Sequence, residues 1–352
     1  MSLGFIKEFR KQMDKKTTVT TNFSPPTHWF STGNLALNKS LSGSYLRGIP
    51  IGRITVFAGE SGSGKSFLCG NAIREAQKDG AFILILDSEN AMDQRFLHDL
   101  GVNTDEDALM YVGVVTIQDV TAVLSDFITG YEKEYGRDNL DAPKVMIIID
   151  SLDMLLTDSE NEKFEKGDQT GDMGQRTKLI KHMLRTIVSR ISRLQIAVAA
   201  THQVYMNQDI TNGQGKFVVN NSVRYSASQI ALISKLNLKE DSEIVGIRMR
   251  VDTYKSRFAK LGTRVEINVP YTKGMDPYDG VLDDLVKEGI VTQAGAWYTL
   301  ALGDNEEPIK FQRKSFGKEI FNRVKLVDSV KAADELVTCD NMMPESVALE
   351  AA

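Results

Sequence analysis

The stretch Gly59-Glu60-Ser61-Gly62-Ser63-Gly64-Lys65-Ser66 decides the fold of this chain. It follows an apolar run and precedes a helical pattern, which is the strand–loop–helix setting of a P-loop. Its glycines let backbone N–H groups point at phosphate oxygens, and the start of the helix adds partial positive charge. A fortuitous glycine-rich turn is the alternative, and the flanking strand and helix argue against it. We expect residues 59–67, from Gly59 to Phe67, to hold the phosphates of a nucleoside triphosphate such as ATP, with Lys65 as their point charge.

Apolar runs alternate with helical patterns on both sides of this loop. The runs have the character of parallel strands buried on both faces, and they cover residues 54–58, 81–87, 145–150 and 196–201. The helical patterns between them cover residues 65–79, 92–100, 117–135 and 174–194. Beyond residue 228, alternating segments at 229–238, 243–254 and 263–269 predict antiparallel strands. The sequence therefore predicts an α/β fold with a mainly parallel central sheet and an antiparallel extension.

The two ends of the chain differ from this core. Residues 3–13 form a short helical pattern with Phe5, Ile6 and Phe9 on one side, too little to fold alone, and a Thr/Ser/Pro linker follows. The last stretch, 334–352, carries five acidic residues and no Lys or Arg, and is interpreted as an acidic tail. We divide the chain into an N-terminal oligomerisation helix and linker (1–30), a core (31–300) and a C-terminal segment with the tail (301–352).

Composition excludes several classes of protein. No stretch approaches 18 apolar residues, and the first residues lack the apolar run of a signal peptide, so we expect no membrane span and a cytoplasmic location. The two cysteines, Cys69 and Cys339, have no disulfide-type or metal-type neighbours, which also favours a reducing compartment. The net charge of −5 argues mildly against nucleic-acid binding unless positive charge clusters locally.

Carboxylates follow two of the expected strands. Asp150 comes directly after five apolar residues and, with the Ser66 hydroxyl, is a candidate ligand for Mg²⁺. Glu89 lies just beyond the strand that ends near Asp87, where it could orient the attacking water. A strand cap is the structural alternative for Asp150. An acid at a helix N-terminus is the alternative for Glu89, and it fits Asp93 too, so spacing alone leaves this choice open.

Several further segments, in order, resemble the RecA family of DNA strand-exchange recombinases. They are Thr32-Gly33-Asn34-Leu35, Pro50-Ile51-Gly52-Arg53-Ile54, Asp87-Ser-Glu-Asn-Ala-Met-Asp93 and Ala294-Gly-Ala-Trp-Tyr298. The segment Gly274-Met-Asp-Pro-Tyr-Asp-Gly280 and the triplet Lys255-Ser256-Arg257 are more similar to the phage branch, the UvsX-type recombinases. The likeness runs from about residue 30 to residue 300.

The resemblance implies a role for residues at matching positions. Glu89 matches the family's catalytic glutamate, and Asp93 and Phe96 match its adenine contacts. The family senses the γ-phosphate at the end of the strand over 196–201, where this chain has His202 and Gln203; its usual Asn-Gln or Asn-His is shifted, so the sensor stays open between the two. Lys255 and Arg257 match the basic pair that the family donates to the ATP of a neighbouring subunit. A solvated basic turn is their structural alternative.

DNA binding is expected at two long non-periodic stretches, interpreted as loops, and at the helix between them. The stretches are 157–172 and 203–221, and the second carries Lys216 and Phe217. The helix places basic residues at spacings of three and four on one face, while apolar residues take the other. We expect this basic face to bind a phosphate backbone, although a solvated helix face is the usual reading of such a pattern. The face carries Lys178, Lys181, His182 and Arg185, and Arg176 is a further basic candidate on the same helix.

Together these features imply an ATP- and Mg²⁺-dependent homologous-recombination protein, a DNA-dependent ATPase. It would form a helical filament on single-stranded DNA, pair it with double-stranded DNA and exchange strands. Expected partners are DNA and further copies of the chain, with a loader or mediator and a single-strand-binding protein as additional candidates. The alternatives are a ring-type DNA helicase on the same core and a non-catalytic ATP-binding mediator of recombination.

Overall fold

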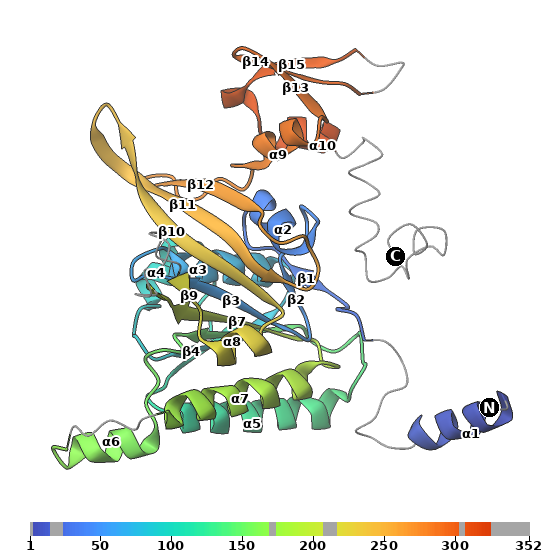
Figure 1. Cartoon of the computed structure of the whole chain (residues 1–352), viewed down its shortest axis with the longest axis vertical. Coiled ribbons are helices and arrows are strands. Elements are labelled where there is room, and N and C mark those ends of the chain that lie inside the picture. Colours follow the sequence, from blue (N-terminus) through green and yellow to red (C-terminus); the bar gives the residue numbers. More distant parts are fainter. Residues whose placement is uncertain (1–2, 15–23, 169–173, 207–216, 303–306, 325–352) are drawn as a thin grey trace, which may run out of the picture.

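The computed structural model describes residues 3–14, 24–168, 174–206, 217–302 and 307–324, and its centre is a sheet of eight strands (Figure 1). Across the sheet the order is β12 (Arg264–Pro270), β11 (Glu243–Ser256), β10 (Gln229–Glu240), β3 (Ile54–Gly59), β7 (Ile196–Gln203), β6 (Val145–Asp150), β4 (Phe82–Asp87) and β5 (Leu109–Gly113). The six strands from β10 to β5 run parallel to one another. β11 is antiparallel to both of its neighbours, β10 and β12. The predicted α/β fold is confirmed.

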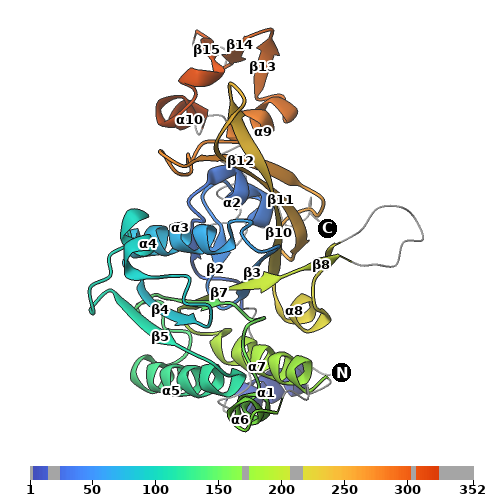
Figure 2. The same ribbon diagram turned by 90° about the vertical axis from the view of Figure 1, so that its left-hand side faces the viewer.

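Helices cover both faces of this sheet (Figures 1 and 2). One face packs on α2 (Leu35–Ser42), α3 (Lys65–Lys78) and α4 (Gln94–Asp99), and the other on α5 (Ile117–Tyr135), α7 (Gln175–Ile191) and α8 (Asn221–Ser226). Successive side chains of a strand point to opposite faces, so both faces of β3 must be apolar to be buried. Phe57 accordingly packs in the first core and Val56 in the second.

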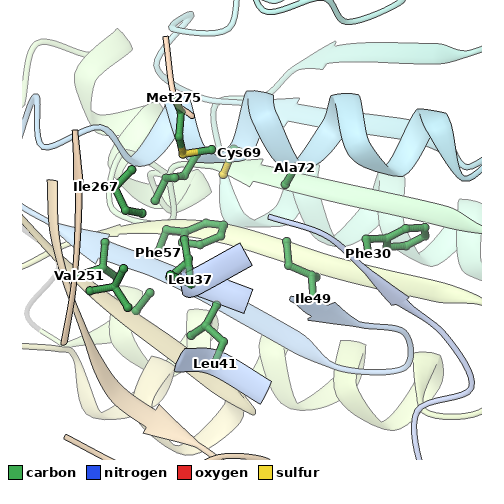
Figure 3. Packing of buried hydrophobic residues seen from close by; sticks show 14 of the residues in the cluster. Phe30, Leu37, Leu41, Ile49, Phe57, Cys69, Ala72, Val251, Ile267 and Met275 are labelled. Carbon is green, nitrogen blue, oxygen red and sulfur yellow. The ribbon is translucent and has the colours of Figure 1, made fainter. Parts of the chain in front are cut away.

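The first core brings residues that are far apart in sequence into contact. Figure 3 shows Phe57 of β3 with Leu37 of α2, Cys69 of α3 and Met275 beyond β12 in one cluster. Cys69 is fully buried, and this burial raises the pKa of its thiol well above the ordinary value. Cys69 is therefore a packing residue.

The register of the parallel strands places their carboxyl ends at one edge of the sheet. Gly59 of β3 lies opposite Gln203 of β7, and Asp87 of β4 lies opposite Asp150 of β6. In an open parallel sheet, ligands bind at this edge. The four residues that the sequence places at strand ends are therefore gathered on one side of the molecule.

A small unit follows β12 at the top of Figure 1. It consists of α9 (Val281–Lys287), β13 (Val291–Ala294), β14 (Trp297–Leu300), β15 (Ile309–Gln312), a 3₁₀ turn (Arg313–Ser315) and α10 (Lys318–Val324). The strands form an antiparallel sheet, and Phe321 of α10 packs edge-on against Tyr45, with ring centroids 5.5 Å apart. This aromatic contact ties the unit back to the segment after α2.

Short elements complete the chain. They are α1 (Leu3–Asp14), β1 (Trp29–Phe30), β2 (Ile49–Pro50), α6 (Asp158–Glu165), β8 (Tyr205–Met206) and β9 (Phe217–Val218). None of the helices in these described segments is long and apolar enough to cross a membrane. The acidic tail expected at 334–352 lies outside the described residues.

One expectation for the chain between β6 and α7 was wrong. Residues 157–172 were expected to be a long non-periodic stretch, yet they contain α6. Its start is fixed by a capping box, in which the Thr157 hydroxyl accepts from the Glu160 N–H (3.1 Å) and the Glu160 carboxylate accepts from the Thr157 N–H (2.7 Å). No residue of α6 is buried, so the helix carries no apolar periodicity that a sequence pattern could reveal.

Candidate functional site

The P-loop forms as expected between β3 and α3. Gly62 (φ 67°) and Gly64 (φ 99°) adopt the left-handed region that glycine favours. Lys65 is 8% exposed, and its Nζ donates to the carbonyl oxygens of Gly59 (3.1 Å) and Glu60 (2.9 Å). Burial lowers the pKa of Lys65, and nearby carboxylates oppose this effect. The lysine is thus held inside the loop with its ammonium at the place where phosphates would bind.

Asp150 and Ser66 have the chemistry of a Mg²⁺ site. Oδ1 of Asp150 accepts from the Thr201 hydroxyl, while Oδ2 is buried and has no hydrogen-bond donor among the described residues. Burial raises the pKa of Asp150, and the nearby hydroxyls of Thr201 and Ser66 lower it. A buried carboxylate oxygen without a partner, beside a hydroxyl, fits a hard cation that takes its other ligands from water and phosphates. In keeping with this, the described residues contain no cluster of three or more His, Cys, Asp or Glu for an all-protein metal cage.

Glu89 lies at the same edge of the sheet and is held in place by two neighbours. Its Oε1 accepts from the Ser151 hydroxyl (2.5 Å), and its backbone N–H donates to Oδ1 of Asp87 (2.8 Å). Asp87 is buried, and its Oδ2 also accepts from the N–H of Met92 (3.0 Å) and the hydroxyl of Tyr111 (3.2 Å). Asp87 therefore shapes the loop that presents the exposed Glu89.

The two residues expected at the adenine lie at the start of α4. Asp93 is the N-cap of this helix, and its Oδ1 accepts from the N–H of Phe96 (2.7 Å). Phe96 is half-buried and packs on the first core close to Gly70 of α3. The structure thus gives Asp93 the capping role that was its structural alternative. Both residues are near the P-loop helix, and their contact with a base stays a prediction.

His202 and Gln203 end β7 beside the P-loop, and their environments differ. His202 is buried, with its Nδ1 2.7 Å from Oδ2 of Asp153 and its Nε2 accepting from the N–H of Asn220 (3.2 Å). Gln203 lies directly opposite Gly59, and its side chain makes no hydrogen bond with any residue that the structure describes. Nε2 of His202 is therefore engaged and Nδ1 lies against Asp153, although Nδ1 forms no hydrogen bond with a described residue. The Gln203 amide has no partner among the described residues and can contact a phosphate.

Lys255 and Arg257 lie away from the P-loop of their own chain. Lys255 of β11 pairs with Ile230 of β10, and Ile230 pairs with Val56 of β3. Lys255 is therefore level with Val56, which precedes Gly59 by three residues, or roughly 10 Å along the strand. Its Nζ donates to the carbonyl oxygens of Arg224 and Ala227 at the end of α8 (2.6 Å each). Burial and the neighbouring arginines lower the pKa of Lys255. One chain does not bring this pair to its own phosphate site.

The basic face of α7 forms as predicted. Lys178, Lys181 and Arg185 are exposed, and neither they nor Arg176 form an ion pair with a described residue. The opposite face of the helix is buried in the second core through Ile180, Met183, Leu184, Ile187 and Ile191. Arg190 near the end of α7 pairs with Glu132 (3.3 Å) of α5, and Arg193 just beyond the helix pairs with Asp138. Lys216 lies outside the described residues, as does the side chain of Phe217.

Sequence reasoning did not identify Asp153 or Thr201. Asp153 comes three residues after Asp150, and Thr201 precedes His202 on β7. Both are polar residues at the carboxyl ends of buried strands, which is the signal that would have found them.

A glycine loop between strand and helix, a buried lysine and an aspartate at the end of a nearby parallel strand together define the class of P-loop nucleoside triphosphatases. Residues 5–276 match the family of the RecA N-terminal domain. The chain belongs to the RecA family. Proteins of this family are DNA-dependent ATPases that act in recombination and repair as filaments on DNA.

Curated relatives are similar to this chain over most of its length. Protein RecA of Leptospira meyeri is 26% identical over 318 residues, which cover 87% of this chain and 76% of that protein. Protein RecA of Syntrophobacter fumaroxidans is 27% identical over 290 residues, which cover 80% of this chain and 78% of that protein. Protein RecA of Wolbachia sp. subsp. Drosophila simulans is 29% identical over 333 residues, covering 90% and 87%.

Proposed function

We propose that this chain is an ATP-dependent recombinase that polymerises on single-stranded DNA and exchanges strands with a homologous duplex. One observation carries the proposal: the P-loop, Asp150 and Glu89 share one edge of the sheet, while Lys255 and Arg257 lie away from it. A site completed by Lys255 and Arg257 therefore requires a second copy of the chain. A contact that uses two different surfaces of the subunit does not close on itself and generates an open helix.

In the proposed nucleotide site, the chain binds ATP between the P-loop and the neighbouring subunit. Lys65 and the loop N–H groups would hold the phosphates, and Ser66 and Asp150 would hold Mg²⁺, which supplies charge neutralisation when it is bound. Glu89, oriented by Ser151, would position the attacking water. Gln203 is the proposed γ-phosphate sensor, because it lies opposite Gly59 and its side-chain amide makes no hydrogen bond with a residue in the described part of the chain.

The proposed DNA surface is the exposed basic face of α7. Its ammonium and guanidinium groups would contact the phosphate backbone, which carries affinity without sequence preference. The net charge of −5 does not oppose this role, because Lys178, Lys181 and Arg185 concentrate positive charge on one helix. The stretch 157–172 precedes α7, and the stretch 203–221 begins at Gln203, at the carboxyl end of β7. Nucleotide and DNA would therefore meet across the carboxyl edge of the sheet.

The proposed oligomerisation element is α1. Its apolar side chains are solvent-exposed in the single chain, with Ile6 at 47% and Phe9 at 49% exposure. A helix of 12 residues with such a stripe gains stability by packing on another surface. We propose that this surface belongs to the adjacent subunit.

The particular branch proposed is that of the phage UvsX-type recombinases. The segment Gly274–Gly280 supports it, together with the triplet Lys255-Ser256-Arg257. The Gly274–Gly280 segment is also structural here, because the side chain of Asn34 donates to the carbonyl oxygens of Asp276 and Asp279 (3.0 Å each). A loader or mediator and a single-strand-binding protein are proposed as partners.

The decisive experiment combines electron microscopy with assays of activity. With single-stranded DNA and a non-hydrolysable ATP analogue, the chain should form helical filaments, and a chain lacking residues 1–23 should not. This truncation spares Ser24, whose hydroxyl donates to the carbonyl of Ser192, and the buried Trp29 and Phe30. Strand exchange between homologous substrates is expected. Directional unwinding of a forked duplex without strand exchange would instead identify a helicase, and DNA-independent assembly without turnover would identify a mediator.

A further inference from the structure

The ribbon formed by β10 and β11 packs directly on the P-loop. A Cβ atom on Gly59 would lie 2.5 Å from the carbonyl oxygen of Ile233, and one on Gly64 would lie 2.7 Å from Sδ of Met249. A Cβ atom on Gly62 would lie 3.0 Å from Nζ of Lys235, which is the atom nearest to it. Glycine is therefore required at 59 and 64 for close packing, and at 64 the positive φ (99°) requires it as well.

Lys235 is brought to the loop by the register of the sheet. Ile233 of β10 pairs with Gly59, and Lys235 follows two residues later, so its side chain leaves the strand on the same face. That face is the one covered by α3, the helix that begins at the end of the P-loop. The ammonium of Lys235 consequently lies next to the backbone of Gly62, at the turn of the loop.

The charge of Lys235 is not used within the described part of the chain. Lys235 is exposed and forms no ion pair or hydrogen bond with a described residue. Arg248 and Arg250, which flank its register partner Met249 on β11, differ in this respect, because both pair with Glu266 of β12. Lys65, below the loop, is likewise satisfied by two carbonyl oxygens. Two lysines therefore lie next to the P-loop: Lys65, which is hydrogen-bonded to carbonyl oxygens, and Lys235, which pairs with no described residue.

We propose that Lys235 is a second phosphate-binding cation of the nucleotide site, supplied by the β10–β11 ribbon of the same chain. The inference rests on the proposed nucleotide site and adds a residue to it. A triphosphate bound by the loop N–H groups concentrates several negative charges within a few ångströms of Gly62. A lysine ammonium on a flexible stem is suited to follow such charge as a point contact. The ribbon would then report on nucleotide occupancy, because one of its side chains binds the ligand.

The test is equilibrium binding of a fluorescent non-hydrolysable ATP analogue with Mg²⁺ to the full-length protein without DNA. Lys235→Met should raise the Kd by about five- to tenfold at low salt, and the difference should narrow as ionic strength rises. Lys235→Arg keeps the charge and should stay within about twofold of the wild type. Lys239→Met is the matched control, since it removes the same charge from the same strand further along the ribbon, and it should bind as the wild type does.

Two results would overturn the proposal. If Lys235→Met binds the analogue as tightly as the wild type, Lys235 makes no phosphate contact. If Lys239→Met weakens binding equally, the effect comes from the general field of the ribbon. A Lys65→Ala chain separates this inference from the proposed function: should it also bind normally, the nucleotide site itself is wrong, whereas loss of binding there with normal Lys235→Met binding refutes only the role of Lys235.

Discussion

His202 and Asp153 form a buried pair at the carboxyl end of the sheet, with Nδ1 of the ring 2.7 Å from Oδ2 of the carboxylate. Nε2 of the ring accepts from the N–H of Asn220, whereas Nδ1 lies against the carboxylate without forming a hydrogen bond to a described residue. The same carboxylate oxygen accepts from the N–H of Gln203 (2.5 Å). Asp153 therefore holds the end of β7 through this hydrogen bond and contacts the imidazole that binds the chain leading into α8.

This pair predicts that Asp153 couples nucleotide binding to DNA binding. Asp153→Ala leaves the Gln203 N–H without its acceptor and removes the carboxylate that lies against the buried His202 ring, which should cost about 1–3 kcal/mol of unfolding free energy. It should also abolish the stimulation of ATP turnover by single-stranded DNA while the Kd for nucleotide changes little. Asp153→Asn keeps an acceptor oxygen and should retain most of the stimulation. Full stimulation in Asp153→Ala, measured as phosphate release with and without DNA, would contradict the coupling role.

Glu89 is predicted to be the residue that activates water. Glu89→Gln keeps the size of the side chain but removes its negative charge, so turnover should fall by about 10²–10⁴-fold with the nucleotide Kd unchanged. Ser151→Ala removes only the hydroxyl that donates to Oε1, and a smaller loss is expected. Phosphate release and analogue binding should be measured on both. Wild-type turnover in Glu89→Gln would favour the non-catalytic mediator.

The sequence predicted the parts of the fold that depend on continuous burial. β3, β4, β6 and β7 are apolar runs because both faces of each strand are covered, and their strand ends carry the predicted site residues. β5 was not predicted. It lies at the edge of the sheet, and its Met110 (50% exposed) and Tyr111 (43% exposed) face solvent, which weakens the apolar pattern.

The candidate site was less visible in the sequence where it depends on contacts between strands. The choice between His202 and Gln203 could not be made from spacing, because it depends on Asp153, three residues beyond β6, and on Asn220 before α8. Lys235 was not singled out, because its proximity to Gly62 follows from the pairing of β10 with β3 and not from any local motif. Long-range register is what a single sequence does not display.

The ionised carboxylate of Asp150 is predicted to lower the unfolding free energy at neutral pH, although the same carboxylate is needed to bind the metal. Its pKa in the folded protein is raised above the ordinary 3.8 by burial, so between these two values the folded state binds more protons than the unfolded state. The unfolding free energy contributed by this group therefore falls as pH rises through that window. Asp150→Asn should unfold at a higher urea concentration than the wild type near pH 7.5, lose this advantage below pH 3.8, and lose Mg²⁺-dependent turnover. A less stable variant at pH 7.5 would refute this.

The basic face of α7 is predicted to set the salt dependence of DNA binding. Lys178→Gln, Lys181→Gln and Arg185→Gln should each weaken binding to single-stranded oligonucleotides and reduce the slope of log K against log salt by about 1. Arg193→Ala is the control on the same segment, because its guanidinium pairs with Asp138 and should affect stability without changing the slope. Fluorescence anisotropy over a salt series measures both. Unchanged slopes in all three α7 variants would move the DNA site elsewhere.

The last prediction concerns whether Lys255 and Arg257 act on a neighbouring subunit. Arg257 is the better residue to change, because its side chain is exposed, whereas Lys255 also bonds to two carbonyl oxygens at the end of α8. Arg257→Ala and Lys65→Ala should each be nearly inactive alone. In a mixed filament, an Arg257→Ala subunit has an intact P-loop and can receive Arg257 from a Lys65→Ala neighbour. In an equal mixture, random assembly makes about one quarter of the interfaces complete, because the contact is heterologous. DNA-stimulated ATP turnover should therefore return to about that fraction of wild type. If the residues act within one chain, no mixture can build a complete site, and turnover will remain at the sum of the two inactive proteins.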